Sequence, residues 1–278
     1  MTLPLDASVH DFSPGPPQQE TSHARCWITR AANFVVMYMQ ARPGAMLVRD
    51  AQPDEYMVFC VDALARVRAG TEAATLQSGT LAIVPPGASR IDIEAEGTLV
   101  LLFSNRATDL LALAANAAHY EAGAPGVAPL ADLPEPAGGF ALRTYRVAEH
   151  RPTDGNMCVF RSRNLMLNIM LPRQAPRNTR ALSPHQHEDF EQGSMALRGD
   201  WVHHLRYPWT KDMSQWREDV HMSIGSPSLL VIPPKVIHTS RNVSEGESWL
   251  LDIFAPPRAD FCARPGMVRN AQDYPYVG

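Results

Sequence analysis

The sequence predicts an all-β protein in which one chain builds two small barrels. Three observations support this prediction. Short apolar runs recur along the 278 residues, and 24 prolines and 17 glycines punctuate them. One β unit occurs twice, and a single segment between the two copies is typical of a helix. Regularly spaced short strands with turn signals between them indicate a β-sandwich or barrel.

The apolar runs have the length of strands rather than of helices. They are NFVVMYM, EYMVFCV, GTLAIVPPG, TLVLLFS, LMLNIML, SLLVIPP and WLLDIFAPP. Turn residues bound each run, which favours strands over buried helices.

The repeat has an offset of 148 residues. GTLAIVPPGASR matches PSLLVIPPKVIH, so that Pro85 corresponds to Pro233 and Arg90 to His238. Each copy precedes another apolar run, TLVLLFS or WLLDIFA, and DEYMVFCVDA upstream of the first copy resembles FEQGSMALRGD upstream of the second. Chance similarity between two proline-terminated strands is the alternative. Two copies of one unit account for more of these matches.

A helix and a linker separate the two copies. The stretch 107–123, ATDLLALAANAAHYEAG, is rich in Ala and Leu, which favour helix, and a Pro/Gly-rich stretch follows it. The C-terminal tail is also proline-rich, and we expect it to pack across a neighbouring barrel. The expected parts are an N-terminal extension (1–30), a first barrel (31–105), the helix and linker (106–140), a second barrel (141–260) and the tail (261–278).

Composition and charge argue against several classes of protein. The formal net charge is −4 without a long charge run, so we expect no nucleic-acid partner. No apolar stretch reaches the roughly 18 residues of a membrane span, and the N-terminus lacks the regions of a secretory signal. The four cysteines stand far apart without metal-binding or redox spacing. We therefore expect a cytoplasmic protein with reduced thiols and no membrane partner.

The segment PHQHEDFEQGSMALRGD carries the clearest chemical signal. His185 and His187 are two residues apart, and side chains with this spacing on a β-strand point to the same face. Imidazole is a ligand that suits zinc, copper, iron and nickel. Six of the ten histidines lie between residues 185 and 238. The alternative is structural use, because a single strand histidine is more often buried in a core or solvated than bound to metal.

This segment resembles the first motif of the cupin family, in which a His-x-His pair precedes an acid or amide and then a glycine, here Gly199. PSLLVIPPKVIHTSRN resembles the second motif, Pro-x-Gly-x-x-His-x3-Asn, with Pro233, His238 and Asn242 in register. The resemblance is strong over these two motifs and weaker over the rest of the repeat. It implies a bicupin, with two double-stranded β-helix (jelly-roll) barrels in one chain.

The resemblance implies four metal ligands, namely His185, His187, Gln192 and His238. A Glu usually stands four intervening residues after the second histidine, and this register leads to Gln192; Glu191 is the alternative ligand. A Gln ligand leaves the site one charge unit more positive than a Glu, which favours an anionic substrate. We expect one divalent transition metal, Fe, Ni, Mn or Zn.

Three departures from the motifs bear on this expectation. Lys235 occupies the usual glycine of the second motif, so that turn is expected to differ in shape, and the upstream glycine of the first motif is absent. In the first copy Arg90 replaces the terminal histidine, and a guanidinium stays protonated and cannot bind a metal. The first barrel is therefore expected to be metal-free, with a structural role; a second reading is that Arg90 holds a carboxylate.

Candidates for proton transfer are Glu191, His203 and His204. Adjacent residues on a strand face opposite ways, so at most one of the two histidines looks into the barrel. A solvated strand face is the alternative for both, and for His221. Four aromatic residues lie between the motifs: Trp201, Tyr207, Trp209 and Trp216. One prediction for them is an aromatic lid over a pocket, and the alternative is that they belong to the core or to an oligomer interface.

Three functions are compatible with this pattern. The favoured one is an enzyme that acts on a small oxygenated (carboxylate or carbonyl) metabolite by isomerase, lyase or ring-opening chemistry, with the metal as Lewis acid. The second is a cupin dioxygenase that uses Fe(II). The third is a protein that binds a metabolite without turnover. We expect a small-molecule substrate and a homodimer.

Overall fold

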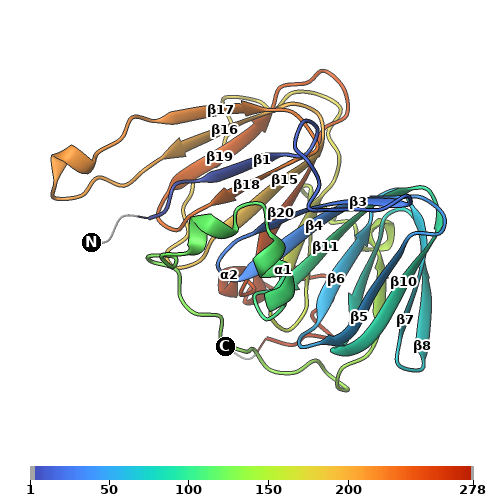
Figure 1. Cartoon of the computed structure of the whole chain (residues 1–278). Coiled ribbons are helices and arrows are strands. Elements are labelled where there is room, and N and C mark those ends of the chain that lie inside the picture. The colour runs from blue at the N-terminus through green and yellow to red at the C-terminus, as the bar shows by residue number, and fades with distance from the viewer. Residues whose placement is uncertain (1–3, 277–278) are drawn as a thin grey trace.

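Two β-barrels lie side by side in the computed structural model, which describes residues 4–276 (Figure 1). The first barrel runs from blue to teal and the second contains the orange and red strands. Each barrel consists of a large and a small sheet, and the helices are few and short. The prediction of an all-β protein with two barrels is confirmed.

The first barrel has a seven-stranded and a four-stranded sheet, and all pairs are antiparallel. The order in the large sheet is β12 (Arg143–Arg146), β9 (Thr80–Val84), β6 (Tyr56–Cys60), β11 (Gly97–Ser104), β4 (Phe34–Ala41), β3 (Ala24–Arg30) and β2 (Gln19–Glu20). The order in the small sheet is β5 (Met46–Gln52), β10 (Gly87–Ala95), β7 (Leu64–Ala69) and β8 (Glu72–Leu76).

The second barrel has a six-stranded and a three-stranded sheet. The order in the large sheet is β1 (Ser8–Asp11), β18 (Ser228–Ile232), β15 (Gln192–Arg198), β20 (Trp249–Phe254), β14 (Met166–Met170) and β13 (Met157–Arg161). The order in the small sheet is β17 (Val220–Ile224), β16 (Trp201–Arg206) and β19 (Ile237–Asn242).

Each barrel receives one edge strand from the other half of the chain. β1 pairs with β18 of the second barrel, and β12 pairs with β9 of the first. The stretch 1–30 therefore contributes a strand to the far barrel, and β2 and β3 start the first barrel ahead of residue 31. Because each exchanged strand covers an open sheet edge with backbone hydrogen bonds, the exchange joins the barrels.

The two large sheets also pack against each other through one apolar layer. On β15 the side chain of Met195 belongs to this layer, whereas Gln192 and Ser194 face the interior of the second barrel. Gly193 lies where a Cβ atom would approach the Phe34 ring to 3.1 Å, so glycine permits the close approach of the sheets. The alternation of β15 thus separates residues of the interface from residues of the barrel interior.

The interiors of the two barrels differ in polarity. A mostly aliphatic cluster fills the first barrel. The second barrel buries polar and ionisable side chains among its apolar ones, and leaving such a group without a partner costs about 1–3 kcal/mol. These buried residues include Asn168, Gln192, Ser194, His203, His238 and Asp252.

The segment 107–123 is helical over a shorter length than its composition predicts. α1 (Thr108–Leu113) is followed by a separate 3-10 turn, η1 (Ala117–Tyr120). Between them the N–H of Ala115 donates to Ile28 O on β3 at 2.8 Å, so pairing with the sheet overrides helix propensity. The remaining helical elements are η2 (Val147–His150), η3 (Met213–Gln215) and α2 (Ala259–Cys262).

The C-terminal tail reaches the first barrel. The Tyr274 hydroxyl donates to Glu55 Oε1 at 2.7 Å, and Asp273 accepts a hydrogen bond from the Tyr145 hydroxyl at 2.8 Å. All four cysteines are free thiols, and three of them are buried. Within residues 4–276, none of the helices has the length and apolar character needed to cross a membrane.

Candidate metal centre

Three histidine rings meet inside the second barrel. His185 and His187 come from the extended segment ahead of β15, and His238 lies on β19. Two backbone hydrogen bonds join the segments, from His185 N to His238 O (3.1 Å) and from His238 N to His185 O (2.8 Å). One nitrogen of each ring lies within 4.8 Å of the others. The fold therefore brings the HxH pair and the distant histidine together.

The turn that leads into His238 is left-handed although it lacks the usual glycine. Lys235 has a φ of 65°, and it is the one non-glycine residue with positive φ in the described part of the chain. Its N–H donates to His187 O at 2.6 Å. Left-handed backbone costs an ordinary residue about 1–2 kcal/mol, yet Lys235 adopts the conformation that favours glycine.

Gln192 directs its side-chain oxygen at two of the three rings. Its Oε1 lies 2.9 Å from His187 Nε2 and 3.1 Å from His238 Nε2. Its amide nitrogen donates to Asp252 Oδ1 at 3.0 Å. The Asn168 amide donates to the other carboxylate oxygen at 3.4 Å. Because a carboxylate accepts hydrogen bonds, Asp252 determines which end of the Gln192 amide faces the histidines.

One close contact in this network cannot be a hydrogen bond, because neither of its two atoms carries a proton. Burial lowers the pKa of His238 to about 3, so the ring is neutral and carries a single N–H. Its Nδ1 lies 2.9 Å from Val236 O and its Nε2 lies 3.1 Å from Gln192 Oε1, and both oxygens are acceptors. One nitrogen lone pair must therefore face an oxygen lone pair. A cation between His238 Nε2 and Gln192 Oε1 would relieve this repulsion.

The spacing of the donor atoms also fits a metal ion. Two ligands that would each lie about 2.1 Å from one metal are roughly 3.0–3.4 Å apart. The Gln192 oxygen lies at 2.9 and 3.1 Å from its two histidine nitrogens. His185 Nδ1 lies 2.9 Å from Ser183 O, and donation to that carbonyl leaves Nε2 available as a ligand.

Burial shifts the pKa values of the site toward the neutral forms. Desolvation lowers the pKa of His187 to about 4 and also lowers the pKa of His185. It raises the pKa of Asp252 to about 6, against the opposite effect of the Asn168 hydrogen bond. At pH 7 the imidazoles are neutral and Asp252 is mostly charged, which are the protonation states that favour metal binding.

A cavity of about 150 Å³ opens beside His185, Gln192 and His238. Two arginines, Arg173 and Arg177, line it. Arg177 is held in place by hydrogen bonds to carbonyl and hydroxyl oxygens of the surrounding loop and strand, whereas Arg173 is exposed. The apolar wall consists of Met157, Met170, Trp201 and Leu250.

Glu191 points away from this cavity. Its carboxylate accepts hydrogen bonds from the Ala32 N–H (2.6 Å) and the Tyr120 hydroxyl (2.9 Å), both in the first half of the chain. Adjacent strand residues face opposite ways, and Gln192 takes the inward position. This placement gives no support to Glu191 as the alternative ligand or as a carrier of protons.

His203 and His204 also face opposite ways. His203 is buried in the barrel, and its Nδ1 lies 2.7 Å from the Oγ of Ser240, which lines the cavity. The His204 ring lies on the other face of the sheet, where its Nδ1 is 2.8 Å from His221 Nδ1. Of the two histidines, only His203 is placed for a role at the cavity.

The four aromatic residues between the motifs do not form one lid. Trp201 and Tyr207 are buried in the second barrel. Trp209 and Trp216 stack with ring centroids 4.2 Å apart on the hairpin that joins β16 to β17, and this hairpin projects from the barrel (Figure 1). Trp209 is 69% exposed. Tyr207 follows the end of β16 and lines the same groove of about 740 Å³ as the two stacked tryptophans, so only Trp201 is separated from the other three.

The first barrel has no comparable histidine, cysteine or carboxylate cluster within residues 4–276. Tyr56 has the same position in the strand pairing of the first barrel as Gln192 has in the second. Its hydroxyl lies 2.9 Å from Ser89 Oγ. Arg90, expected at the place of the terminal histidine, is exposed and pairs with Asp92 at 2.6 Å. An irregularity at the start of β10 accompanies this outward placement.

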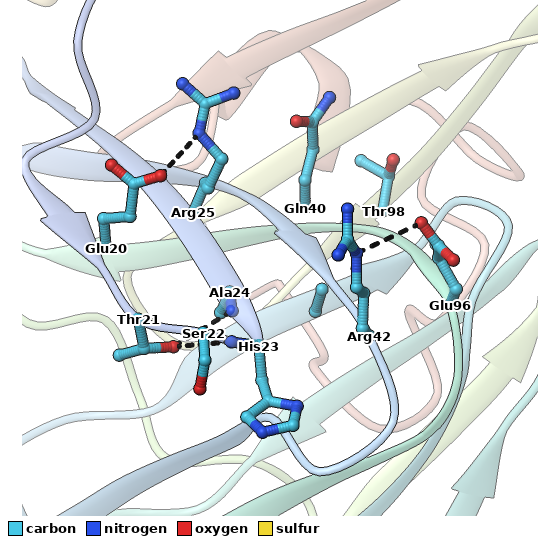
Figure 2. Close-up of a pocket in the computed structure, with 12 residues that line it drawn as sticks. Glu20, Thr21, Ser22, His23, Ala24, Arg25, Gln40, Arg42, Glu96 and Thr98 are labelled. Carbon is cyan, nitrogen blue, oxygen red and sulfur yellow. Dashed lines mark hydrogen bonds and ion pairs between the residues drawn. The ribbon is translucent and has the colours of Figure 1, made fainter.

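A larger groove of about 430 Å³ lies on the first barrel (Figure 2). Arg25 pairs with Glu20 at 3.3 Å, and Arg42 pairs with Glu96 at 3.6 Å. These exposed charges neutralise each other, and no metal-binding cluster lies among the groove residues. The smaller cavity of the second barrel is therefore the better candidate for chemistry.

Several site residues lie outside the motifs. Asp252 is a single acid in the apolar run WLLDIFA, and Asn168 is a single amide in LMLNIML. An isolated polar residue at an inward strand position is a signal that would have identified both. Arg177 and Ser240 have no such signal, because nothing in their local sequence indicates the cavity.

Solved structures with a similar fold have low sequence identity to this chain. A variant of Bacillus subtilis oxalate decarboxylase has a TM-score of 0.62 and 14% identity, covering 93% of this chain and 78% of that one. Another structure of that enzyme, described with Mn(II) centers, has a TM-score of 0.62 and 14% identity, with coverage of 95% and 82%. No protein-family model and no curated protein matches the sequence.

Two further structures are similar over most of their length. AerE from Microcystis aeruginosa has a TM-score of 0.56 and 10% identity, covering 91% of this chain and 98% of that one. A cupin 2 conserved barrel domain protein from Leptotrichia buccalis has a TM-score of 0.50 and 10% identity, with coverage of 85% and 91%. At these identities the likeness shows the fold, and the chain has the fold of a bicupin, with two cupin barrels in one polypeptide.

Proposed function

We propose that this protein is a metal-dependent enzyme that acts on a small carboxylate- or carbonyl-containing acid. The observation that carries the proposal is the environment of His238. Its neutral ring faces oxygen acceptors at both nitrogens, and the Gln192 oxygen lies at the spacing of a neighbouring metal ligand. A bound cation accounts for both facts.

His185, His187, Gln192 and His238 would hold one divalent transition metal. Bound there, the metal would polarise a carbonyl or carboxylate oxygen as a Lewis acid. The four donors are neutral, and Asp252 behind Gln192 adds one negative charge. The loaded centre therefore keeps a net positive charge, which favours an anionic substrate.

The cavity supports a small acid as substrate. Its volume of about 150 Å³ is comparable to an apolar cavity that takes a benzene-sized ligand of about six heavy atoms. Arg173 and Arg177 line it, and guanidinium groups bind carboxylates with directed hydrogen bonds. The structurally similar Bacillus subtilis protein is an oxalate decarboxylase described with Mn(II) centers, which agrees with a small acid and a divalent metal.

Isomerase, lyase and ring-opening reactions all require a proton transfer near the polarised oxygen. His203 and Ser240 would take this role, which is supported by Ser240 lining the cavity with its hydroxyl oxygen 2.7 Å from Nδ1 of the buried His203 ring. The Fe(II) dioxygenase stays the second candidate, since three imidazoles and an amide oxygen also suit iron.

The test begins with metal analysis of the purified protein, followed by incubation of the loaded protein with oxalate and slightly larger oxo-, hydroxy- and dicarboxylic acids. Product formation followed by NMR, without oxygen uptake, supports the proposed class. Oxygen uptake indicates the dioxygenase, and a retained, unaltered ligand indicates a binding protein. His187→Ala serves as the inactive control. A wild-type protein that binds no divalent metal contradicts the proposal.

A further inference from the structure

Glu191 links the candidate metal centre to the first half of the chain. It directly precedes Gln192, and the two side chains leave opposite faces of the sheet. Glu191 is only 3% exposed, and both of its carboxylate oxygens accept hydrogen bonds. The donors are the Ala32 N–H at 2.6 Å and the Tyr120 hydroxyl at 2.9 Å. A buried carboxyl group thus has its hydrogen bonds supplied by the other barrel and its linker.

These donors are themselves held by the first barrel. Ala32 lies in the turn between β3 and β4, and Tyr120 lies on η1. Asn116, which immediately precedes η1, binds the backbone of Arg30 twice, as acceptor from its N–H (2.9 Å) and as donor to its carbonyl (2.8 Å). The Arg30 guanidinium lies over the Tyr120 ring at 4.7 Å. The Tyr120 hydroxyl therefore has a defined position relative to the first sheet.

Besides Glu191, the chain between His187 and Gln192 is supported by Phe190, whose ring stacks on His187 and packs edge-on against Phe254. Glu188 and Asp189 are exposed, and residues 188–190 form no helix or strand. The Asp189 carbonyl accepts a hydrogen bond from the linker N–H of Ala128 at 2.8 Å. Glu191 is the buried end of this segment, and its hydrogen bonds attach the segment to the first half of the chain directly before Gln192, whose backbone pairs with Ile232 and Phe254.

The same arrangement occurs on the first barrel, where the residue next to the glutamate is not a candidate metal ligand. Glu55 is buried and accepts hydrogen bonds from the Arg163 N–H (2.9 Å) and the Tyr274 hydroxyl (2.7 Å), both from the second half of the chain. The residue after Glu55 is Tyr56, which stands at the place of Gln192. The chain therefore contains a natural control for the arrangement around Glu191.

A short repeated motif underlies the two arrangements. NAAHY ends in Tyr120 and NAQDY ends in Tyr274, so both read Asn-Ala-x-x-Tyr. Asn270 binds the backbone of Arg161 twice, at 3.1 and 2.8 Å, as Asn116 binds Arg30. Each motif follows its own barrel and reaches across to the buried glutamate of the other barrel.

We propose that the first barrel holds the amide ligand of the metal centre in position through Glu191, with Tyr120 as a positioning residue. The inference rests on the proposed metal centre. Loss of the Tyr120 hydroxyl leaves a buried carboxylate oxygen without its partner, and the resulting shift of the Glu191 backbone displaces Gln192 from its place between His187 and His238. The corresponding loss at Tyr274 displaces Tyr56, which holds no metal.

The test compares Tyr120→Phe with Tyr274→Phe, because both remove one hydroxyl from a buried glutamate. Co²⁺ is titrated into each full-length, metal-free protein, and its dissociation constant and visible spectrum are recorded. Changes to groups that orient metal ligands typically weaken binding about 10–100-fold. We expect such a loss and an altered spectrum for Tyr120→Phe. Tyr274→Phe should bind as the wild type does, while both variants lose a similar few degrees of Tm.

Three results would overturn the inference. If both variants bind Co²⁺ as tightly as the wild type, the Tyr120 hydroxyl does not position the ligand. If both variants lose the same affinity, the loss is a general effect on stability. If Tyr120→Phe does not fold, Glu191→Gln and its counterpart Glu55→Gln give the same comparison. If the wild type does not bind Co²⁺, both the proposed function and the inference are wrong. If the wild type binds Co²⁺ and the two variants have the same affinity as each other, only the inference is wrong.

Discussion

The amide nitrogen of Gln192 on β15 donates a 3.0 Å hydrogen bond to Asp252 on the adjacent strand β20. This bond turns the Gln192 oxygen toward His187 and His238. It also places a negative charge directly behind a neutral ligand. The extra positive charge expected from Gln in place of Glu is therefore offset by a carboxylate one hydrogen bond further from the metal position.

Replacing this carboxylate tests its contribution. Asp252→Asn keeps the size of the side chain and removes its charge, so we expect metal affinity to fall roughly 10-fold or more. Isothermal titration with Co²⁺ measures the change. Asp219→Asn, an exposed acid paired with Arg206 on the same barrel, is the control and should bind metal normally. Unchanged affinity in Asp252→Asn would mean that the carboxylate does not act on the centre.

Converting Gln192 to a glutamate brings two buried carboxylates together. The introduced carboxyl group cannot donate to Asp252 unless it is protonated, and like charges about 3 Å apart do not both ionise readily. For Gln192→Glu we expect a lower Tm of the metal-free protein and a larger increase on adding metal. Thermal unfolding with and without Co²⁺ checks this. A variant with the same Tm shift as the wild type would place residue 192 outside the centre.

Metal binding should tolerate mild acid. The pKa of His187 is lowered to about 4 and that of His238 to about 3, so these rings stay neutral well below pH 6.5 and need not lose protons to bind. Asp252, with its pKa raised to about 6, takes up one proton as the pH falls through that value, which weakens the centre. Between pH 6.5 and 5 we expect Asp252 and the exposed His185 to supply the competing protons, so that fewer than three protons compete per metal.

Competitive Co²⁺ titrations across this pH range measure that number. Three ordinary imidazoles would give a slope near three protons per metal. In Asp252→Asn the dependence should become shallower by about one proton, because the carboxylate no longer titrates. A steep loss of binding near pH 6.5 in the wild type would contradict the assignment of buried, neutral ligands.

Arg173 provides a test of substrate charge. A hydrogen bond to a charged group contributes about 1.5–3 kcal/mol, so Arg173→Gln should lower kcat/KM for an acid substrate by roughly 10–100-fold, mainly through KM. Metal affinity should stay unchanged because Arg173 touches none of the proposed ligands. Arg180→Gln, an exposed arginine nearby in sequence, is the control. An equal effect on an uncharged substrate analogue would argue against carboxylate binding.

The projecting hairpin is where we expect the homodimer to form. Trp209 and Trp216 stack on it, and Met213 between them is 71% exposed. Burying such a surface is favourable, so the double substitution of both tryptophans by Ala should convert a dimer to a monomer in sedimentation experiments. Metal content should be unaffected. A wild-type monomer, or a variant that stays dimeric, would place the interface elsewhere.

The local sequence was enough to predict the candidate ligands. The His185-x-His187 pair was recognised from its spacing and motif, although the structure forms only an isolated bridge at His185 and no strand there. The repeat predicted two barrels because each copy carries the same order of strands and turns. The register of the motif favoured Gln192 over Glu191, and the structure places Gln192 at the rings. Features of this kind can be predicted from the sequence because they depend on residues that are close together along the chain.

The tertiary structure alone decided what surrounds these residues. Asp252 orients Gln192 across a strand pair, Tyr120 reaches Glu191 from the other half of the chain, and β1 and β12 exchange barrels. Each of these contacts joins segments that are distant in sequence, and local propensity says nothing about which distant partners meet. Their arrangement follows from the packing of the sheets, where a buried polar group requires a hydrogen-bond partner that a strand distant in sequence or the other barrel supplies.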